Sequence, residues 1–229
     1  CCTAFPSYAT PGNHDWGSVA AQKDDLTPYL ETFFLPTHTN TQDHPENYYS
    51  LDYGPLHFIG LDSQFEVGDT PTTGSPITRL TEDIPDDDML DWATADIEAA
   101  GTTRWNIAAF HHPAYTGQAD RTPELHVLLK LLPWVEEHPI DLVLNGHNHL
   151  YERFTGLERG VKVDDGGQTW IVTGGGGASL YDIGPNEDRD AGQEIHHFLL
   201  LDISPCTIEG QVIIGDGTAF DTFTMSRCD

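Results

Sequence analysis

Three histidine-containing loops each directly follow an apolar run that is predicted to form a β-strand. The loops are Asn13-His14-Asp15 after residues 5–10, His111-His112-Pro113 after residues 105–110, and His147-Asn148-His149 after residues 141–145. Loops at the carboxyl ends of strands gather at one edge of an α/β sheet. Imidazole nitrogens and amide oxygens suit divalent or trivalent metals. The chain is therefore expected to fold so that these loops meet and supply metal ligands.

Helical patterns lie between the strand-like runs. Residues 86–100 carry apolar side chains at helical spacing, with Asp86-Asp87-Asp88 at the start and Gly101 after the end;. A second helix is predicted to start at Thr122-Pro123, with a buried face of Leu125, Leu128, Leu129 and Leu132 before Pro133 interrupts it;.

Strands dominate the rest of the chain. Residues 48–52 and 56–62 flank Tyr53-Gly54-Pro55 and read as a β-hairpin;. Residues 170–173 are predicted to form a strand that ends at four glycines, residues 174–177. At these glycines we expect the backbone to approach another part of the chain closely, near the site. The tail, residues 197–223, reads as strands. The pattern predicts an α/β fold with a mixed sheet and a second sheet packed on it, in one domain over residues 1–229.

The charge balance excludes two classes of partner. The formal net charge is -27, with 10 Lys and Arg against 37 Asp and Glu. Nucleic acids and anionic membranes both require a basic surface. No apolar run is long enough to span a bilayer. We therefore expect neither a nucleic-acid-binding surface nor a membrane association.

The four cysteines lie near the two ends of the chain, as Cys1, Cys2, Cys206 and Cys228. Their spacing does not match a zinc finger. Disulfides near the termini are expected, and these point to an oxidising compartment, either extracellular or periplasmic. Four cysteines allow three pairings, and the spacing does not choose among them.

Taken in order, the three loops resemble a known signature. Gly-Asn-His-Asp, His-x-Pro and Gly-His-x-His are similar to the second half of the signature of the calcineurin-like metallophosphoesterases. The run from Gly146 to Arg153, together with residues 46–58 and 173–178, is similar to the purple acid phosphatases in particular. The resemblance covers most of the chain and implies a two-sheet β-sandwich flanked by helices.

The resemblance also implies a site with two metal ions, iron paired with zinc, manganese or iron. Carried onto this sequence, it makes Asn13, His111 and His147 ligands of one metal and His149 a ligand of the other. A hydroxide activated by the two metals would attack phosphorus.

Two further roles follow from the resemblance. His14 would hydrogen-bond the phosphate and protonate the leaving group, and Asp15 would orient its ring.

His112 is expected to lie just outside the ligands, and Tyr115 to line the pocket or to belong to the core. The pair His196-His197 matches no motif and is expected to be structural.

The family signature begins with acidic and histidine ligands upstream of Gly-Asn-His. None of the twelve residues that precede Asn13 is an Asp. The sequence is therefore expected to lack the N-terminal part of the fold. We therefore expect either that this chain binds one metal ion only, or that an upstream fragment supplies the missing ligands of the two-metal site.

The activity implied by the resemblance is hydrolysis of small phosphomonoesters by a secreted enzyme. Two alternatives stay open. One is a phosphodiesterase or nucleotidase of the same superfamily, because pocket shape decides the substrate. The other is an inactive fragment or a non-catalytic binding protein on this scaffold.

Overall fold

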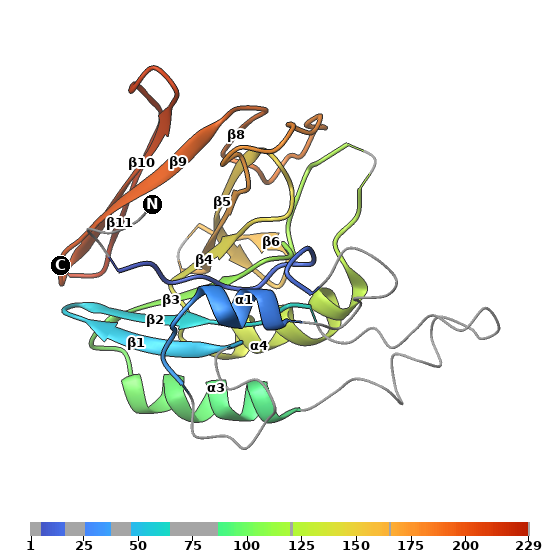
Figure 1. Ribbon diagram of the computed structural model, residues 1–229. Helices are drawn as coiled ribbons and strands as arrows, with labels where there is room; N and C mark the ends of the chain where they lie inside the picture. The colour runs from blue at the N-terminus through green and yellow to red at the C-terminus, as the bar shows by residue number, and fades with distance from the viewer. Residues whose placement is uncertain are drawn as a thin grey trace.

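The computed structural model describes residues 6–16, 26–37, 47–64, 87–119, 121–164 and 166–228. Two sheets and a layer of helices make up this part of the chain (Figure 1). The helices α3 (Asp87–Ala100) and α4 (Leu132–Glu137) lie on one side of the larger sheet, and the C-terminal sheet lies on the other. The predicted α/β fold with two sheets is confirmed. None of the helices described is long and apolar enough to cross a membrane.

The larger sheet has four parallel strands at its centre. Its order is β1-β2-β3-β4-β7-β5-β6, with β8 paired to β5. The bounds are β1 (Tyr49–Tyr53), β2 (Leu56–Gly60), β3 (Trp105–Phe110), β4 (Leu142–Asn145), β5 (Tyr151–Glu158), β6 (Val161–Lys162), β7 (Gln168–Thr173) and β8 (Ala191–Gln193). Strands β2, β3, β4 and β7 are parallel, while β1 and β5 pair antiparallel to their neighbours. The predicted hairpin is β1–β2.

Strand β3 explains why the centre of this sheet reads as a continuous apolar run. Every residue of β3 is buried. Ala108 and Phe110 pack toward the helices, whereas Trp105 and Ile107 pack toward the C-terminal sheet. Because both faces are covered, the strand needs apolar side chains at every position rather than at alternate ones.

The helical segment after Thr122 differs from its prediction. After two helical residues, 125 and 126, it forms a π-helical stretch, η1 (Val127–Leu131), and continues as α4. Val127 and Leu131 are buried, whereas Leu125 is 46% exposed and Leu129 is 49% exposed. The wider π turn shifts the buried face away from the spacing of an α-helix. Pro133 does not end the helix, because it lies in the first turn of α4, where no N–H is needed;.

The second sheet has the order β11-β10-β9 and contains β9 (His197–Ile203), β10 (Thr207–Ile214) and β11 (Ala219–Ser226). Ile208 and Val212 of β10 are fully buried against Trp105 and Ile107 of the larger sheet. Burying such aliphatic side chains contributes about 1.5–3 kcal/mol each. This contact joins the two sheets.

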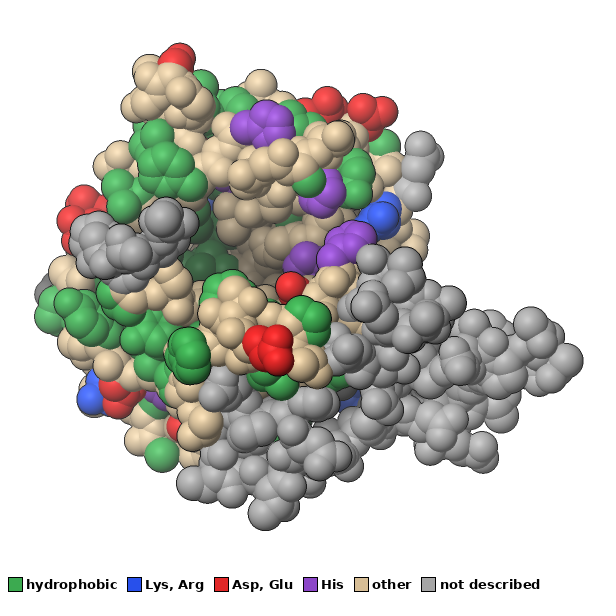
Figure 2. Space-filling view, in the orientation of Figure 1, with side chains coloured by type: hydrophobic (Ala, Val, Ile, Leu, Met, Phe, Trp, Pro, Cys, Tyr) green, Lys and Arg blue, Asp and Glu red, His purple; other side chains and the backbone are tan. Residues whose placement is uncertain are grey.

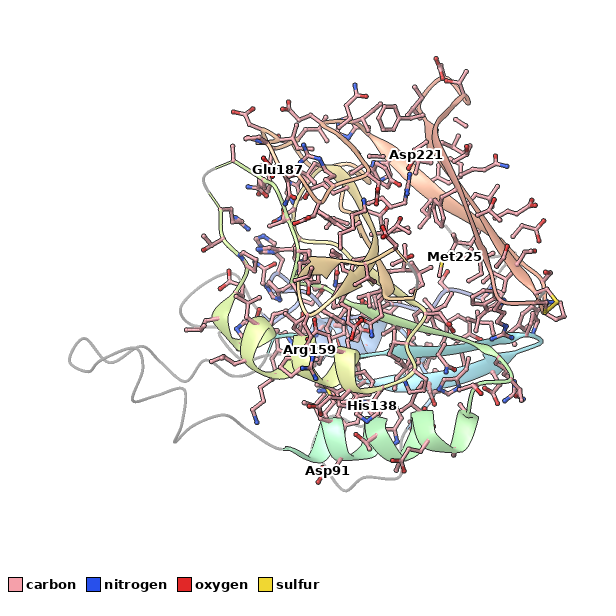
Figure 3. All side chains as sticks on the ribbon, turned by 180° about the vertical axis from the view of Figure 1, so that it is seen from behind. Asp91, His138, Arg159, Glu187, Asp221 and Met225 are labelled. Atoms are coloured by element: carbon pink, nitrogen blue, oxygen red, sulfur yellow. A yellow bond between two sulfur atoms is a disulfide. The ribbon has the colours of Figure 1, made fainter. Side chains whose placement is uncertain are left out.

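A polar contact also connects the sheets. The carboxylate of Asp221 on β11 accepts hydrogen bonds from Tyr151 Oη at 2.8 Å and from Arg153 Nε at 2.8 Å and Nη2 at 3.2 Å. Figure 3 labels Asp221 and Met225 on this C-terminal sheet. Since Tyr151 and Arg153 belong to β5, the interaction fixes the sheet beside the strand that leaves the last histidine loop.

A disulfide joins Cys206 and Cys228. It connects the residue before β10 to the chain just after β11, so it closes the open end of this hairpin. The expectation of a disulfide near the C-terminus is confirmed for this pair. Cys1 and Cys2 lie outside the described residues.

The strand predicted over residues 5–10 is wrong for its described part, residues 6–10, which form no strand. Pro6 has no N–H to donate to a neighbouring strand. The carbonyl of Ala9 instead accepts a hydrogen bond from the hydroxyl of Tyr29 at 2.6 Å. Tyr29 belongs to the short helix α1 (Thr27–Thr32), which holds this segment in place.

Candidate metal centre

The loops that follow the parallel strands meet at one edge of the larger sheet. Ser63 follows β2, His111 follows β3, His147 follows β4 and Gly174 follows β7. Figure 2 shows a hollow on one face of the molecule with histidine side chains beside it and a basic side chain among them. The structure therefore brings together the loops that the sequence pattern predicted to meet.

Asn13, His111 and His147 form the centre of this site. Nε2 of His111 lies 2.9 Å from Oδ1 of Asn13. Nδ1 of His147 lies 3.3 Å from the same oxygen and 3.2 Å from Nε2 of His111. Three potential ligand atoms from three separate loops thus converge on one point.

Glycines make room for these imidazoles. A Cβ atom on Gly12 would lie 2.7 Å from Nδ1 of His111, and one on Gly146 would lie 3.3 Å from it. His147 has a φ angle of 62°, in the left-handed region that non-glycine residues rarely adopt;. This backbone conformation belongs to the turn that directs its ring toward His111, and such strain is typical of functional loops.

His149 lies beside the cluster in a defined tautomer. Its Nδ1 lies 2.8 Å from the carbonyl oxygen of Ser179, which can only accept a hydrogen bond;. In the neutral ring Nδ1 therefore carries the proton, and Nε2 keeps a lone pair with which it could bind a metal ion. The ring stacks on Tyr181 with centroids 4.2 Å apart and an interplanar angle of 10°.

His14 and Asp15 are both exposed at the turn that follows Gly12. Asp15 accepts a hydrogen bond from the backbone N–H of Gly12 at 2.8 Å, so it stabilises the turn. Among the described residues, no hydrogen bond joins Asp15 to the His14 ring. His14 lies close enough to His111 and His147 that its charge would lower the pKa of both imidazoles.

His112 lies behind the cluster and Tyr115 lies away from it. Nδ1 of His112 is 2.9 Å from Oγ of Ser63, and its ring centroid is 4.4 Å from that of His147. Tyr115 packs edge-on against Trp170 in the core, and its hydroxyl donates to Glu136 at 3.1 Å. The structure thus brings His112 to the site and leaves Tyr115 in the core.

The sequence reasoning did not single out Ser63 and His126. The Ser63 hydroxyl contacts His112, and the Ser63 carbonyl accepts a hydrogen bond from Nε2 of His126 at 2.8 Å. Ser63 directly follows the second predicted strand of the hairpin, which places it at the same edge of the sheet as the histidine loops. The loop after this strand contains no histidine motif, and a serine after a strand does not by itself indicate a functional site.

Asp62 is a third residue near the site that no sequence motif marks. Its carboxylate is buried and accepts hydrogen bonds from Gln64 N at 2.8 Å, Trp16 Nε1 at 3.1 Å and Asn47 Nδ2 at 3.4 Å. Burial raises the pKa of Asp62 to about 7, although these hydrogen bonds act to lower it. Through Trp16 it supports the turn that carries Asn13.

Burial keeps the clustered imidazoles neutral. The pKa of His111 is lowered to about 4, that of His147 to about 3 and that of His112 to about 2, mainly by desolvation and in smaller part by neighbouring histidines. A neutral imidazole has a lone pair, which metal coordination requires. The cluster is therefore ready to bind a cation near neutral pH without first losing protons.

The spacing of the ligand atoms fits a transition metal. Around a metal with ligands at about 2.1 Å, neighbouring ligand atoms lie about 3.0–3.4 Å apart. The distances among Asn13, His111 and His147 are 2.9, 3.2 and 3.3 Å. A ring nitrogen of His112 also lies within 4.8 Å of those of His111 and His147. Its Nδ1 is engaged by Ser63, so we favour the set that includes Asn13.

The last histidine loop is held by contacts from two sides. A Cβ atom on Gly174 would lie 2.0 Å from the carbonyl oxygen of Asn148, so only glycine allows this approach. On the other side, Asn148 Nδ2 donates to Oγ1 of Thr116 at 2.7 Å, and Thr116 donates to Glu152 at 2.7 Å. The predicted close approach at the glycine run is confirmed at Gly174.

Relatives of this chain include acid phosphatases. Purple acid phosphatase 23 of Arabidopsis thaliana is 26% identical over 175 residues, which are 75% of this chain and 34% of that protein. An acid phosphatase of Aspergillus ficuum is 25% identical over 195 residues, covering 66% of this chain and 31% of that protein. The chain thus spans about a third of the length of these relatives.

Solved structures share the fold. A purple acid phosphatase from yellow lupin seeds has a TM-score of 0.73 at 19% identity, and the match covers 97% of this chain and 38% of that one. GAP50, described as the anchor in the inner membrane complex of Plasmodium, has a TM-score of 0.58 at 16% identity, with 81% and 56% covered.

A family model assigns the chain on its sequence. The model of the calcineurin-like phosphoesterases matches residues 3–151, which include all three histidine loops. The matched part carries Asn13, His111 and His147, whose candidate ligand atoms the fold brings within 3.3 Å of one another. With its similarity to purple acid phosphatases, this chain belongs to the calcineurin-like phosphoesterase family.

Proposed function

We propose that this chain is the catalytic domain of a metal-dependent phosphatase that hydrolyses phosphomonoesters. The observation that carries the proposal is the convergence of Asn13, His111 and His147 at the edge of the parallel sheet. Its family membership and its acid phosphatase relatives support the reaction class.

The geometry supports the ligand roles that the family resemblance implies. Asn13 Oδ1, His111 Nε2 and His147 Nδ1 would hold one metal, and Nε2 of His149 would contribute to a second. Fe, Zn and Mn all accept such nitrogen and oxygen ligands. Divalent or trivalent cations would supply a water nucleophile near neutral pH and neutralise charge on the phosphate oxygens. In a protein of net charge -27, the cations would also attract the substrate;.

The surrounding side chains would position the substrate and move a proton. His14 is exposed at the edge of the cluster, where its imidazole could donate a proton to the leaving oxygen of an ester;. Asp15 would act on His14 indirectly, since its carboxylate fixes the Gly12 turn. His112 would hold His111 and His147 from behind through ring contacts.

The Cys206–Cys228 disulfide supports a secreted location, either extracellular or periplasmic. Disulfides persist in oxidising compartments and are rare in the cytosol;. The acidic surface agrees with this proposal, because it keeps a secreted protein soluble.

The test combines metal analysis with two substrates. The purified chain is loaded with Zn, Mn or Fe, its metal content is measured, and hydrolysis of 4-nitrophenyl phosphate is compared with that of bis(4-nitrophenyl) phosphate. Preference for the monoester would support the proposal. A clear preference for the diester would instead favour a phosphodiesterase. Less than about one metal per chain, with no hydrolysis, would favour a non-catalytic protein.

A matched pair of variants connects the activity to the site. His147→Ala removes a proposed ligand, and we expect loss of one metal and at least a hundredfold loss of hydrolysis. His196→Ala is the control, since this exposed ring hydrogen-bonds the carbonyl of Gly175 and contacts none of Asn13, His111 and His147 in the described structure. Equal losses in both variants would contradict the assignment of His147.

A further inference from the structure

A single arginine contacts one histidine of the last loop and the aromatic ring that stacks on the other. Nη1 of Arg121 contacts Nε2 of His147, and the guanidinium carbon lies 5.5 Å from the ring centroid of Tyr181. Tyr181 in turn stacks on His149. Arg121 and Tyr181 therefore form a wall beside the ligand cluster, which neither the motifs nor the family signature assigned.

The surroundings of Arg121 differ from those of several other basic side chains. Arg153 is paired with Asp221, Arg189 with Glu152 and Lys162 with Asp190. Among the residues that the structure describes, Arg121 contacts no carboxylate. Its position beside His147 distinguishes it from other exposed arginines, because its free donors lie next to the candidate metal centre. The planar set of donors of a guanidinium fits a phosphate group.

The contact with Arg121 determines which ring nitrogen of His147 carries the proton. Arg121 can only donate hydrogen bonds, so Nε2 of His147 must accept and Nδ1 must carry the ring proton;. Metal coordination by Nδ1 requires the opposite tautomer, with the proton on Nε2. A protonated Nε2 no longer accepts a bond from Arg121. The two uses of His147 therefore exclude each other.

We propose that Arg121 is a phosphate-binding side chain that His147 holds in place until a metal binds at Nδ1 of His147. Metal binding then releases the guanidinium to bind an anion, and Tyr181 provides a flat surface for the organic group of the ester. Metal loading and phosphate binding are thereby coupled through one imidazole. This inference rests on the metal site of the proposed function, and it adds the residue that recognises the charge of the substrate.

The coupling predicts opposite effects of one substitution. Arg121→Ala removes a competitor of the metal, so affinity for Zn should rise about threefold to tenfold. The same change removes charged hydrogen bonds to phosphate, so affinity of the Zn-loaded protein for inorganic phosphate should fall about tenfold or more. Damage to the fold would lower both affinities, so the opposite signs separate the mechanism from instability.

The experiment titrates the chain with Zn and then titrates the Zn-loaded chain with inorganic phosphate, by calorimetry. Arg159→Ala is the matched control. Arg159 is an exposed arginine between β5 and β6, labelled in Figure 3, and it should change neither affinity. Arg121→Lys keeps the charge without the planar donors and should restore part of the phosphate affinity.

These titrations do not depend on turnover. Phosphate binding that is unchanged in Arg121→Ala, or lost equally in Arg159→Ala, would overturn the inference even if the wild-type chain hydrolyses phosphomonoesters. A wild-type chain that binds Zn but no phosphate would overturn it as well. Opposite shifts in a chain without hydrolysis would leave the inference standing and reject the proposed catalytic function.

Discussion

The side-chain oxygen of Asn13 lies 2.9 Å from Nε2 of His111, although the two residues are 98 positions apart in the sequence. If this oxygen is a metal ligand, Asn13→Ala should weaken Zn or Mn binding at least tenfold, whereas Asn13→Asp should keep or strengthen it because a carboxylate is the better ligand. Competition with a chelator of known affinity measures both. Equal affinity in wild type and Asn13→Ala would exclude Asn13 from the site.

The glycine run offers a test of the backbone contact. Gly174→Ala would place a Cβ atom 2.0 Å from the Asn148 carbonyl, so the last histidine loop must shift. We expect a loss of about 3 kcal/mol or more in the free energy of unfolding, together with weaker metal binding. Gly176→Ala is the control, since its Cβ would meet no atom within 4 Å. Denaturant unfolding and metal titration distinguish the two variants, and matching results would refute the close approach.

The buried imidazoles predict how stability depends on pH. The pKa values of His111, His112 and His147 are about 4, 2 and 3 in the folded chain, below the ordinary value of 6.5. Between about pH 4 and 6.5 the unfolded chain binds more protons at these rings. Stability of the metal-free protein should therefore be full above pH 6.5 and fall as the pH drops.

Asp62 acts in the opposite direction. Its pKa is raised to about 7, so its contribution to stability falls as the pH rises from about 4 to 7;. Three imidazoles outnumber this one carboxyl, so the net stability should still decrease toward acid pH. Urea unfolding in the presence of a chelator at pH 7, 6 and 5 measures the slope. The slope should shrink in His112→Ala, and an unchanged slope would contradict the burial of this ring.

The polar connection between the sheets predicts a large effect on stability. Asp221→Ala would leave Arg153 and the Tyr151 hydroxyl without their shared partner in a mostly buried position. We expect a loss of about 2–4 kcal/mol, since the mostly buried Arg153 would keep only its longer ion pair with Asp190, at 4.0 Å;. Asp202→Ala, at an exposed position on β9, should change stability by less than about 0.5 kcal/mol;. A small effect of Asp221→Ala would show that the apolar contact alone joins the sheets.

Much of the fold could be predicted because its signals are local. The strand β3 and the helix α3 were recognisable from apolar spacing and flanking residues, and both lie within one residue of their predicted bounds. The buried face of η1 could not be predicted, because a π-helical stretch changes the spacing without a distinct sequence pattern;. The missing strand at residues 6–10 depended on whether a neighbouring strand was available, which is a property of the whole sheet.

The residues of the candidate site also fall into those that the sequence predicts and those that it does not. Its histidines were predictable because each loop has a motif, and the parallel sheet brings the loops after β3 and β4 together without further information;. The Asn13 loop follows no strand, so the sheet does not explain its position. Ser63 and Arg121 were not predictable, since each has meaning only through what lies across the site from it. Ser63 contacts His112 from 49 positions away, and no sequence spacing encodes such a contact.

The separation of Asn13 from His147 by 134 positions has a consequence for how the protein folds. Only a chain that has assembled the parallel sheet presents these ligand atoms together, so the unfolded chain has no preformed site. A cation would then bind the native state alone and raise the free energy of unfolding by about 2.7 kcal/mol at a hundred times its dissociation constant. Metal supply would thus set the lifetime of the folded protein as well as its activity.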